Sequence, residues 1–187
     1  MPTIEEFLDD AKRRMDKSIE TTRTEFNSVR TGRASAALLD RISIDYYGTP
    51  TPLKNMATIG VPEPRMITVQ PFDASQIKAI EKAVQESDLG LTPSNDGKLI
   101  RLPIPQLTEE RRKELVKIVR NMAEEGKVAV RNVRRDCMTH LKELVDNGDV
   151  GADEEHRAED RVQKLTDEHT AKIDELLKRK EAEIMEV

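Results

Sequence analysis

The sequence predicts an α+β protein in which an elongated three-helix bundle carries a small inserted β/α/β domain. Three segments each show one apolar stripe at helical spacing, one before residue 31 and two after residue 105. The segment between them alternates apolar and polar residues and holds eight of the nine prolines. Residues 1–30 and 106–187 are therefore expected to form the bundle, and residues 31–105 the inserted domain.

The first helix is expected to begin at a capping box made by Thr3 and Glu6. Gly32 is the expected stop. Between them, apolar residues or tolerated replacements recur every three or four positions, at Ile4, Leu8, Ala11, Met15, Ile19, Thr22, Phe26 and Val29.

The second helix is expected to follow Pro105, with Thr108 as N-cap and Gly148 as the C-terminal break. Its length of about 39 residues corresponds to about 58 Å. Its expected stripe is Leu115, Val119, Met122, Gly126, Ala129, Val133, Cys137, Leu141 and Leu144. The third helix is expected to start near Asp153, with Val162, Leu165, His169, Ile173, Leu176 and Ile184 on one face.

The middle segment predicts short strands near residues 42–48, 66–72 and 98–104, and a short helix over 74–87. In that helix Ile77, Ile80 and Val84 are expected to face inward. Two chain crossings, RTGRAS and RLPIPQL, join this domain to the bundle, which allows bending about a defined axis in an L-like body. The expected hinge residues are Arg30, Thr31, Gly32, Arg33, Pro103, Ile104 and Pro105.

Positive charge is concentrated on the second helix of a chain whose net charge is -5. Residues 111–135 hold nine Lys or Arg against three Glu, a local charge of +6, which leaves -11 for the rest. At about 100° per residue, most of these cations fall within about 60° of Arg120. Only Glu124 interrupts that row, and the other nearby acids fall on a third side. The row consists of Lys113, Lys117, Arg120, Lys127, Arg131, Arg134 and Arg135.

A straight row of one sign suits a phosphate backbone, because guanidinium groups hold phosphate oxygens in two-point contacts. No aromatic residue interleaves with the row, so structured RNA read through its backbone fits better than stacked single strands. The alternative is an ordinary solvated surface. Because Arg134 is expected to face water, its replacement by Ala is expected to weaken binding with little loss of fold.

The sequence shows no catalytic constellation, metal-ligand cluster or phosphate-binding loop, so we expect neither an enzyme nor a cofactor. His169 and Cys137 fall on apolar lines, where structural roles are expected. There is no secretory signal and no apolar run long enough to span a membrane, and the single cysteine suits a reducing compartment. We therefore expect a cytoplasmic protein.

Six motifs in order along nearly the whole chain resemble the bacterial ribosome recycling factor family: VRTGRAS, YYGTPTPL, SDLGL, LTEERR, VRNVRRD and QKLTD. The resemblance implies a helical bundle that grips large-subunit ribosomal RNA and a small domain that faces elongation factor G, in an L with a tRNA-like outline. It implies that the factor, with elongation factor G and GTP, splits post-termination ribosomes and releases mRNA and deacylated tRNA.

The resemblance also carries over three RNA-contacting residues, which are Arg112, Arg131 and Arg134. Arg112 lies about 80° off the row, toward the apolar stripe. The expected partners are the ribosome and elongation factor G, with no membrane or DNA partner and a monomeric chain. The alternative is a helical adaptor or oligomerising protein that pairs its charged row with a protein partner, although this gives no reason for an inserted domain with two crossings.

Overall fold

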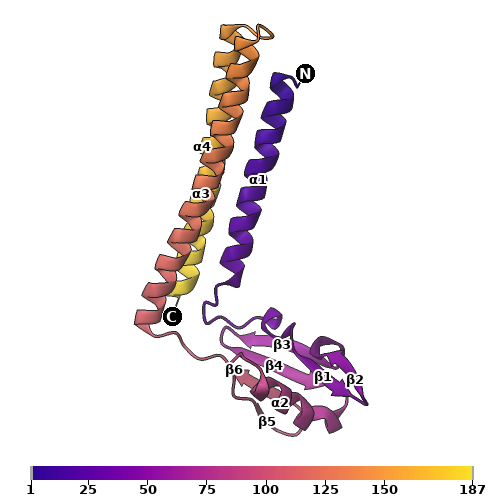
Figure 1. Ribbon diagram of the computed structural model, residues 1–187. Coiled ribbons are helices and arrows are strands. Elements are labelled where there is room, and N and C mark those ends of the chain that lie inside the picture. The colour runs from indigo at the N-terminus through magenta and orange to yellow at the C-terminus, as the bar shows by residue number, and fades with distance from the viewer. Residues whose placement is uncertain (1, 187) are drawn as a thin grey trace. The chain divides into compact units, whose positions relative to one another are not determined.

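The computed structural model describes residues 2–186, which divide into two compact units (Figure 1). One unit contains the helices α1 (Ile4–Ser28), α3 (Glu109–Asp146) and α4 (Ala152–Met185), and the other is Thr31–Thr108. The second boundary lies three residues later than the sequence suggested. Leu107 lies next to Gly32, which belongs to the smaller unit: a Cβ added at Gly32 would be 3.2 Å from Leu107 Cγ. This proximity accounts for part of the difference.

Helix α1 begins as expected. The Thr3 N–H donates to Glu6 Oε2 at 2.6 Å, and the Glu6 N–H donates to Thr3 Oγ1 at 3.3 Å, so the capping box is confirmed. The expected stop at Gly32 is wrong. The helix ends at Ser28 because Val29 is already extended, with φ -82° and ψ 118°.

The length of α3 and the start of α4 lie close to those expected from the sequence. Helix α3 has 38 residues and ends before Gly148, whose φ of 77° lets the Asp149 N–H donate back to Leu144 O at 2.9 Å. Helix α4 begins at Ala152, one residue before the expected start. Each of the three helices packs against the other two, which confirms the three-helix bundle.

The buried faces of α3 and α4 differ in detail from the expected stripes. Ala123 and Val130 are buried on α3 where Met122 and Ala129 were expected. On α4, Thr166 and Lys180 are buried, whereas Leu165 and Leu176 are only half-buried. A helix that touches two neighbours buries a wider face than one line of residues, so spacing alone cannot choose between adjacent positions.

The smaller unit contains two antiparallel sheets and one α-helix (Figure 1). Strands β1 (Ser43–Tyr46) and β2 (Thr49–Pro52) form a hairpin. The second sheet has the order β3 (Ala57–Glu63), β4 (Met66–Pro71), β6 (Ile100–Pro103) and β5 (Ser94–Asn95). Helix α2 (Ile77–Glu86) follows β4 in the chain. Its inward residues are confirmed as Ile77, Ile80 and Val84.

The three expected strands are present as β1, β4 and β6, but β2, β3 and β5 were not expected. Strand β2 carries Pro50 and Pro52, which a two-stranded hairpin tolerates because its outer edge needs no donors. Strand β3 contains Gly60 and Pro62 and shifts register between Gly60 and Glu63. Strand β5 has only two residues, too few to show a period.

Candidate nucleic-acid interface

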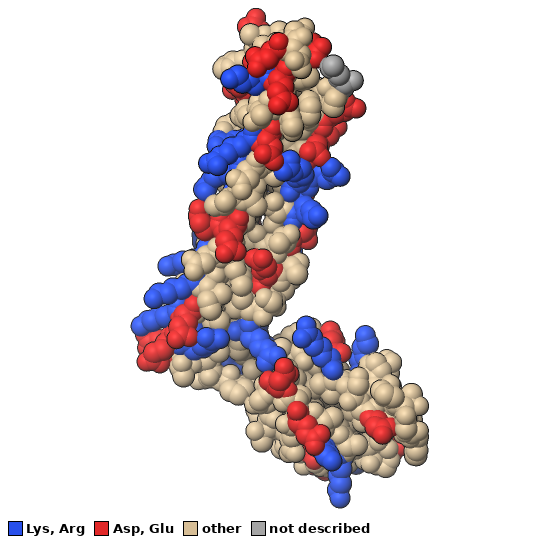
Figure 2. Space-filling view, viewed as in Figure 1, with Lys and Arg blue, Asp and Glu red and all other residues tan. Residues whose placement is uncertain are grey.

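The basic row occupies one long face of α3. Because α3 is a single helix from Glu109 to Asp146, residues spaced by three, four and seven positions share that face. In Figure 2, Lys and Arg side chains project in succession along the lower left edge of the helical unit, with carboxylates among them. The row is therefore a surface of mixed charge with a basic majority.

Several cations of the row are already paired within the protein. The Arg120 Nε lies 2.5 Å from Glu181 Oε1, and the Lys127 Nζ lies 3.0 Å from Asp174 Oδ1. Arg131 Nη1 donates to Glu124 Oε1 at 3.1 Å. The expectation that Glu124 is the only acid within the row is therefore wrong. A wheel drawn for one helix cannot show the acids that a neighbouring helix contributes, and α4 contributes Asp174 and Glu181.

These contacts shift the ionisation of the groups involved. The hydrogen bond from Arg131, followed by the charge of Lys127, lowers the pKa of Glu124. The hydrogen bond to Asp174 raises the pKa of Lys127 against a desolvation effect, and the hydrogen bond to Glu181 raises that of Arg120. These shifts favour the charged forms of Glu124, Lys127 and Arg120.

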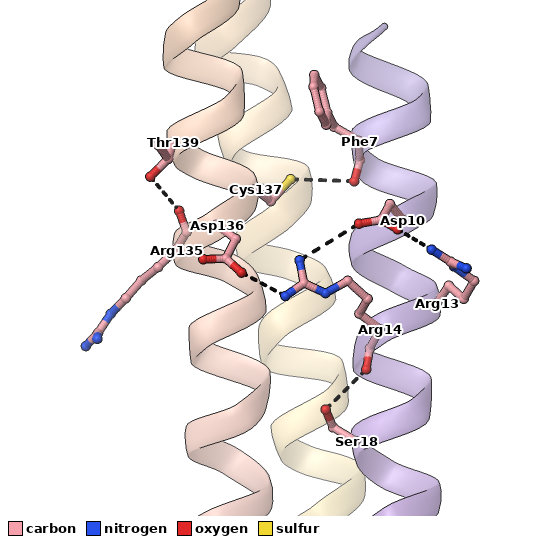
Figure 3. A network of polar contacts seen from close by, with 9 residues as sticks. All are labelled: Phe7, Asp10, Arg13, Arg14, Ser18, Arg135, Asp136, Cys137 and Thr139. Carbon is pink, nitrogen blue, oxygen red and sulfur yellow. Dashed lines mark hydrogen bonds and ion pairs between the residues drawn. The ribbon is translucent and has the colours of Figure 1, made fainter. Parts of the chain in front are cut away.

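Arg134 and Arg135 are adjacent in sequence but lie in different surroundings. Arg134 is half-buried, and its Nη1 donates to Gln163 Oε1 of α4 at 2.9 Å, so the expectation that it faces only water is wrong. Arg135 extends away from the bundle into solvent (Figure 3). Within residues 2–186, no ion pair involves Arg135 or the exposed Lys117, which leaves both cations open to an incoming phosphate.

Arg112 lies apart from the row, as its position on the wheel predicted. It is half-buried, and its Nε atom is buried with no hydrogen-bond partner among the described residues. A buried donor without a partner costs free energy of about 1–3 kcal/mol. An acceptor that this side chain brought against its Nε atom by moving would remove that cost.

The histidine and cysteine on apolar lines are confirmed as structural. His169 is buried and bonds to Asp16 and to Leu165 O, while burial raises the pKa of the Cys137 thiol to about 11. That thiol is protonated at neutral pH and is a poor nucleophile. Among residues 2–186, no group of three or more His, Cys, Asp or Glu is placed to hold a metal ion.

Both crossings between the units are attached to the same turn of the smaller unit. The Ala34 N–H donates to Pro64 O at 2.7 Å, and the Ile104 N–H donates to Arg65 O at 2.8 Å. Pro103 belongs to β6, where it pairs with Met66, and so lies before the irregular segment 104–108. Irregular backbone is therefore confined to residues 29–35 on one side and 104–108 on the other.

Comparison with known proteins identifies the family to which the chain belongs. The family model described as ribosome recycling factor matches residues 22–185. The chain belongs to the ribosome recycling factor family. It is 57% identical to the ribosome-recycling factor of Rubrobacter xylanophilus over 96% of this chain and 97% of that one, and 54% identical to that of Geobacillus kaustophilus with the same coverage.

Solved structures of ribosome recycling factors have the same fold. A solution structure matches with a TM-score of 0.74 and 42% identity, covering both chains completely. A second match has a TM-score of 0.63 and 46% identity over 99% of this chain and 100% of the other; it is described as models of the T. thermophilus ribosome recycling factor and the E. coli elongation factor G bound to the E. coli post-termination complex. Ribosome recycling factors are non-enzymatic translation factors. No helix within residues 2–186 is long and apolar enough to cross a membrane.

The sequence reasoning missed the carboxylates of α4, although a signal for them exists. Asp167, Asp174 and Glu181 are spaced by seven residues, as are Arg134, Lys127 and Arg120 on α3. Two helices joined by the short connection 147–151 run antiparallel. Residue numbers that increase along α3 are therefore matched by residue numbers that decrease along α4. Matching these two series would have indicated the pairs.

Proposed function

We propose that this chain recycles ribosomes after translation termination. It binds the intersubunit space of the post-termination ribosome. With elongation factor G, and with GTP hydrolysis by that factor, it splits the ribosome and releases mRNA and deacylated tRNA. The observation that carries the proposal is the family match over residues 22–185, together with the relative described with elongation factor G on a post-termination complex. Because ribosomes are cytoplasmic, the chain acts there, as a monomer.

In this proposal α3 supplies the contact with large-subunit ribosomal RNA. Lys117 and Arg135 offer open positive charge, and Arg112 offers a donor without a partner. The other cations of the row already donate to protein acceptors, so RNA must share them with those acceptors or displace the acceptors; they are Arg120, Lys127, Arg131 and Arg134. Phosphate contacts of this kind fix position and orientation rather than sequence, which suits a factor that recognises one shape.

The smaller unit acts as the moving part. Both crossings are attached at Pro64 and Arg65, so bending is expected in the irregular residues beyond these two hydrogen bonds. The proposed hinge therefore consists of Arg30, Thr31, Gly32 and Arg33 on one side and Ile104 and Pro105 on the other, with Pro103 as the strand end that supports it. Elongation factor G supplies the force, and the chain itself makes or breaks no covalent bond.

The decisive experiment mixes the purified chain with post-termination polysomes, elongation factor G and GTP, and follows polysome breakdown on a density gradient. Breakdown that requires all three components supports the proposal. Salt-sensitive ribosome binding without breakdown points to an incompatible elongation factor G or to a hinge that does not bend. Absence of any binding contradicts the proposal and favours a helical adaptor.

The RNA-contacting face is tested separately with Arg135→Ala, because this exposed side chain makes no ion pair or side-chain hydrogen bond among residues 2–186 that its loss would break. Binding to purified large subunits is expected to weaken, and the slope of log affinity against log salt to fall by about one unit. Lys172→Ala is the matched control, an exposed cation of α4 that lies in no ion pair of the described residues. Equal slopes for Arg135→Ala and the unaltered chain would remove Arg135 from the interface.

A further inference from the structure

The cations of α3 meet a series of acceptors on α4 in a regular antiparallel register. Arg120 contacts Glu181 and Lys127 contacts Asp174, so a step of seven residues up α3 matches a step of seven down α4. The third step places Arg134 opposite Asp167. Gln163 connects these two, since it accepts from Arg134 Nη1 at 2.9 Å and donates from Nε2 to Asp167 Oδ1 at 2.9 Å. We call Asp167, Asp174 and Glu181 the acidic ladder.

Glu124 adds a fourth carboxylate from α3 itself. It contacts Lys127 at 3.4 Å and Arg131 at 3.1 Å. The pair with Lys127 has the spacing of three at which side-chain pairs stabilise a helix only slightly, and the pair with Arg131 spans seven residues, beyond that spacing. Exposed ion pairs of this kind contribute little to folding. Stabilisation of α3 is therefore a weak explanation for an acid in the middle of a basic row.

A carboxylate and a phosphate present the same chemistry to a guanidinium or an ammonium group, namely anionic oxygens that accept hydrogen bonds. Each ladder carboxylate that contacts a cation therefore occupies a position that a phosphate oxygen would take. A phosphate must displace the carboxylate or share the cation with it, and the carboxylate repels it at short range. Lys127 is the most strongly engaged, because its half-buried ammonium contacts both Asp174 and Glu124.

We infer that the acidic ladder and Glu124 act as intramolecular counter-charges that compete with ribosomal RNA for the basic row and so weaken the grip of the bundle. The inference rests on the proposed function, because it assigns a regulation to the same RNA-contacting face. A factor that must leave the ribosome after each round needs a contact that can be broken. The open cations Lys117 and Arg135 make the first phosphate contacts, and the paired cations follow by exchange of acceptors.

The test measures binding of the full chain to purified large subunits across a series of KCl concentrations. Glu181→Gln frees Arg120 and is expected to tighten binding at low salt by about two- to fivefold, the range to which an exposed ion pair corresponds. The salt dependence becomes steeper, because one more cation is available to phosphate. Asp174→Asn and Glu124→Gln are expected to act in the same direction.

Asp160→Asn is the matched control. Asp160 is the next residue of the same heptad on α4 and is exposed, but within residues 2–186 it forms no ion pair. Its replacement changes the net charge by the same amount without freeing a cation of the row. A second control combines Glu181→Gln with Arg120→Ala, and here the effect of Glu181→Gln is expected to disappear. Urea unfolding of every variant verifies that the bundle is intact.

Each result decides the matter. Tighter binding for the ladder variants but not for Asp160→Asn supports the inference. Equal effects at Asp160 and Glu181 would overturn it in favour of net charge alone, and unchanged binding would overturn it directly. Weaker binding in Glu181→Gln would also overturn it, since the carboxylate would then be orienting Arg120 toward RNA. If the unaltered chain fails to bind large subunits, the proposed function itself has failed, which is distinguishable from every result above.

Discussion

Asp16 on α1 and the buried His169 on α4 are joined by a hydrogen bond in which Oδ1 and Nε2 are 2.7 Å apart. The other ring nitrogen of His169 lies 2.6 Å from the carbonyl oxygen of Leu165, within α4. Lys12 contacts the second oxygen of Asp16 at 3.1 Å. One carboxylate therefore links two helices of the bundle and is itself supported from its own helix.

This link predicts a dependence of stability on pH. The hydrogen bond from His169, and to a smaller degree Lys12, lowers the pKa of Asp16. A carboxyl whose pKa is depressed by folding contributes stability that is present above its unfolded value of about 3.9 and is lost as pH falls through the folded value. The free energy of unfolding should therefore fall below about pH 4, and Asp16→Asn should reduce that fall.

The measurement is urea unfolding followed by circular dichroism from neutral to acidic pH. Asp16→Asn is expected to be less stable than the unaltered chain at neutral pH and to approach it in acid. Asp160→Asn is the control, because its exposed carboxylate joins no other helix within the described residues. Parallel curves for Asp16→Asn and the unaltered chain at all pH values would contradict the prediction.

Gly126 is expected to be required for the close contact between α1 and α3. A Cβ at this position would overlap Thr22 Oγ1 and lie 3.3 Å from Ile173 Cδ1. Gly126→Ala is therefore expected to lower the free energy of unfolding by about 1–3 kcal/mol, although Ala favours a helix more than Gly does. Thr22→Ala in the same chain should restore part of the loss, since it removes the overlapping oxygen. Gly151→Ala meets nothing within 4 Å and should change little; equal midpoints for both single variants would refute this account.

Gly32 has a positive φ of 76°, and a Cβ added there would lie 3.2 Å from Leu107 Cγ and 3.7 Å from Pro105 O. Gly32→Ala is therefore expected to disturb the two crossings and to reduce polysome breakdown more than large-subunit binding. Gly90→Ala is a matched control, because Gly90 has a φ of 66° and open space around it. Both variants carry the backbone cost of about 1–2 kcal/mol, but only one affects the crossings. Equal losses of breakdown and binding in Gly32→Ala would argue against a hinge role.

Cys137 is expected to be unreactive in the folded chain. Its thiol is buried, its Sγ lies 3.7 Å from the carbonyl oxygen of Phe7 (Figure 3), and its pKa is raised to about 11. Compared with a free cysteine, the thiolate fraction at pH 8 is lower by about a hundredfold or more. Labelling with a thiol reagent at pH 8 should be slow without denaturant and fast in urea. Similar labelling rates in both conditions would show that α1 moves away from α3 and exposes the Cys137 thiol without denaturant.

Several elements were readable from the sequence because their causes are local. The capping box at Thr3, the break at Gly148 and the inward face of α2 depend on residues within one or two turns of each other. The strands of the smaller unit were less readable. Strand β5 is defined only by its pairing with β6. The prolines of β2 argued against a strand there, although β2 pairs with β1 in a hairpin.

The same division applies to the candidate site. The sequence by itself determined that α3 carries a row of cations on one face, because a single helix converts spacing directly into direction. Only the tertiary structure decided which of those cations are free. Packing of α4 against α3 pairs Arg120 with Glu181 and Lys127 with Asp174 while leaving Arg135 in solvent. Residues about 50 to 60 positions apart meet only after both helices have buried their apolar faces, so charge availability is a property of the packed bundle.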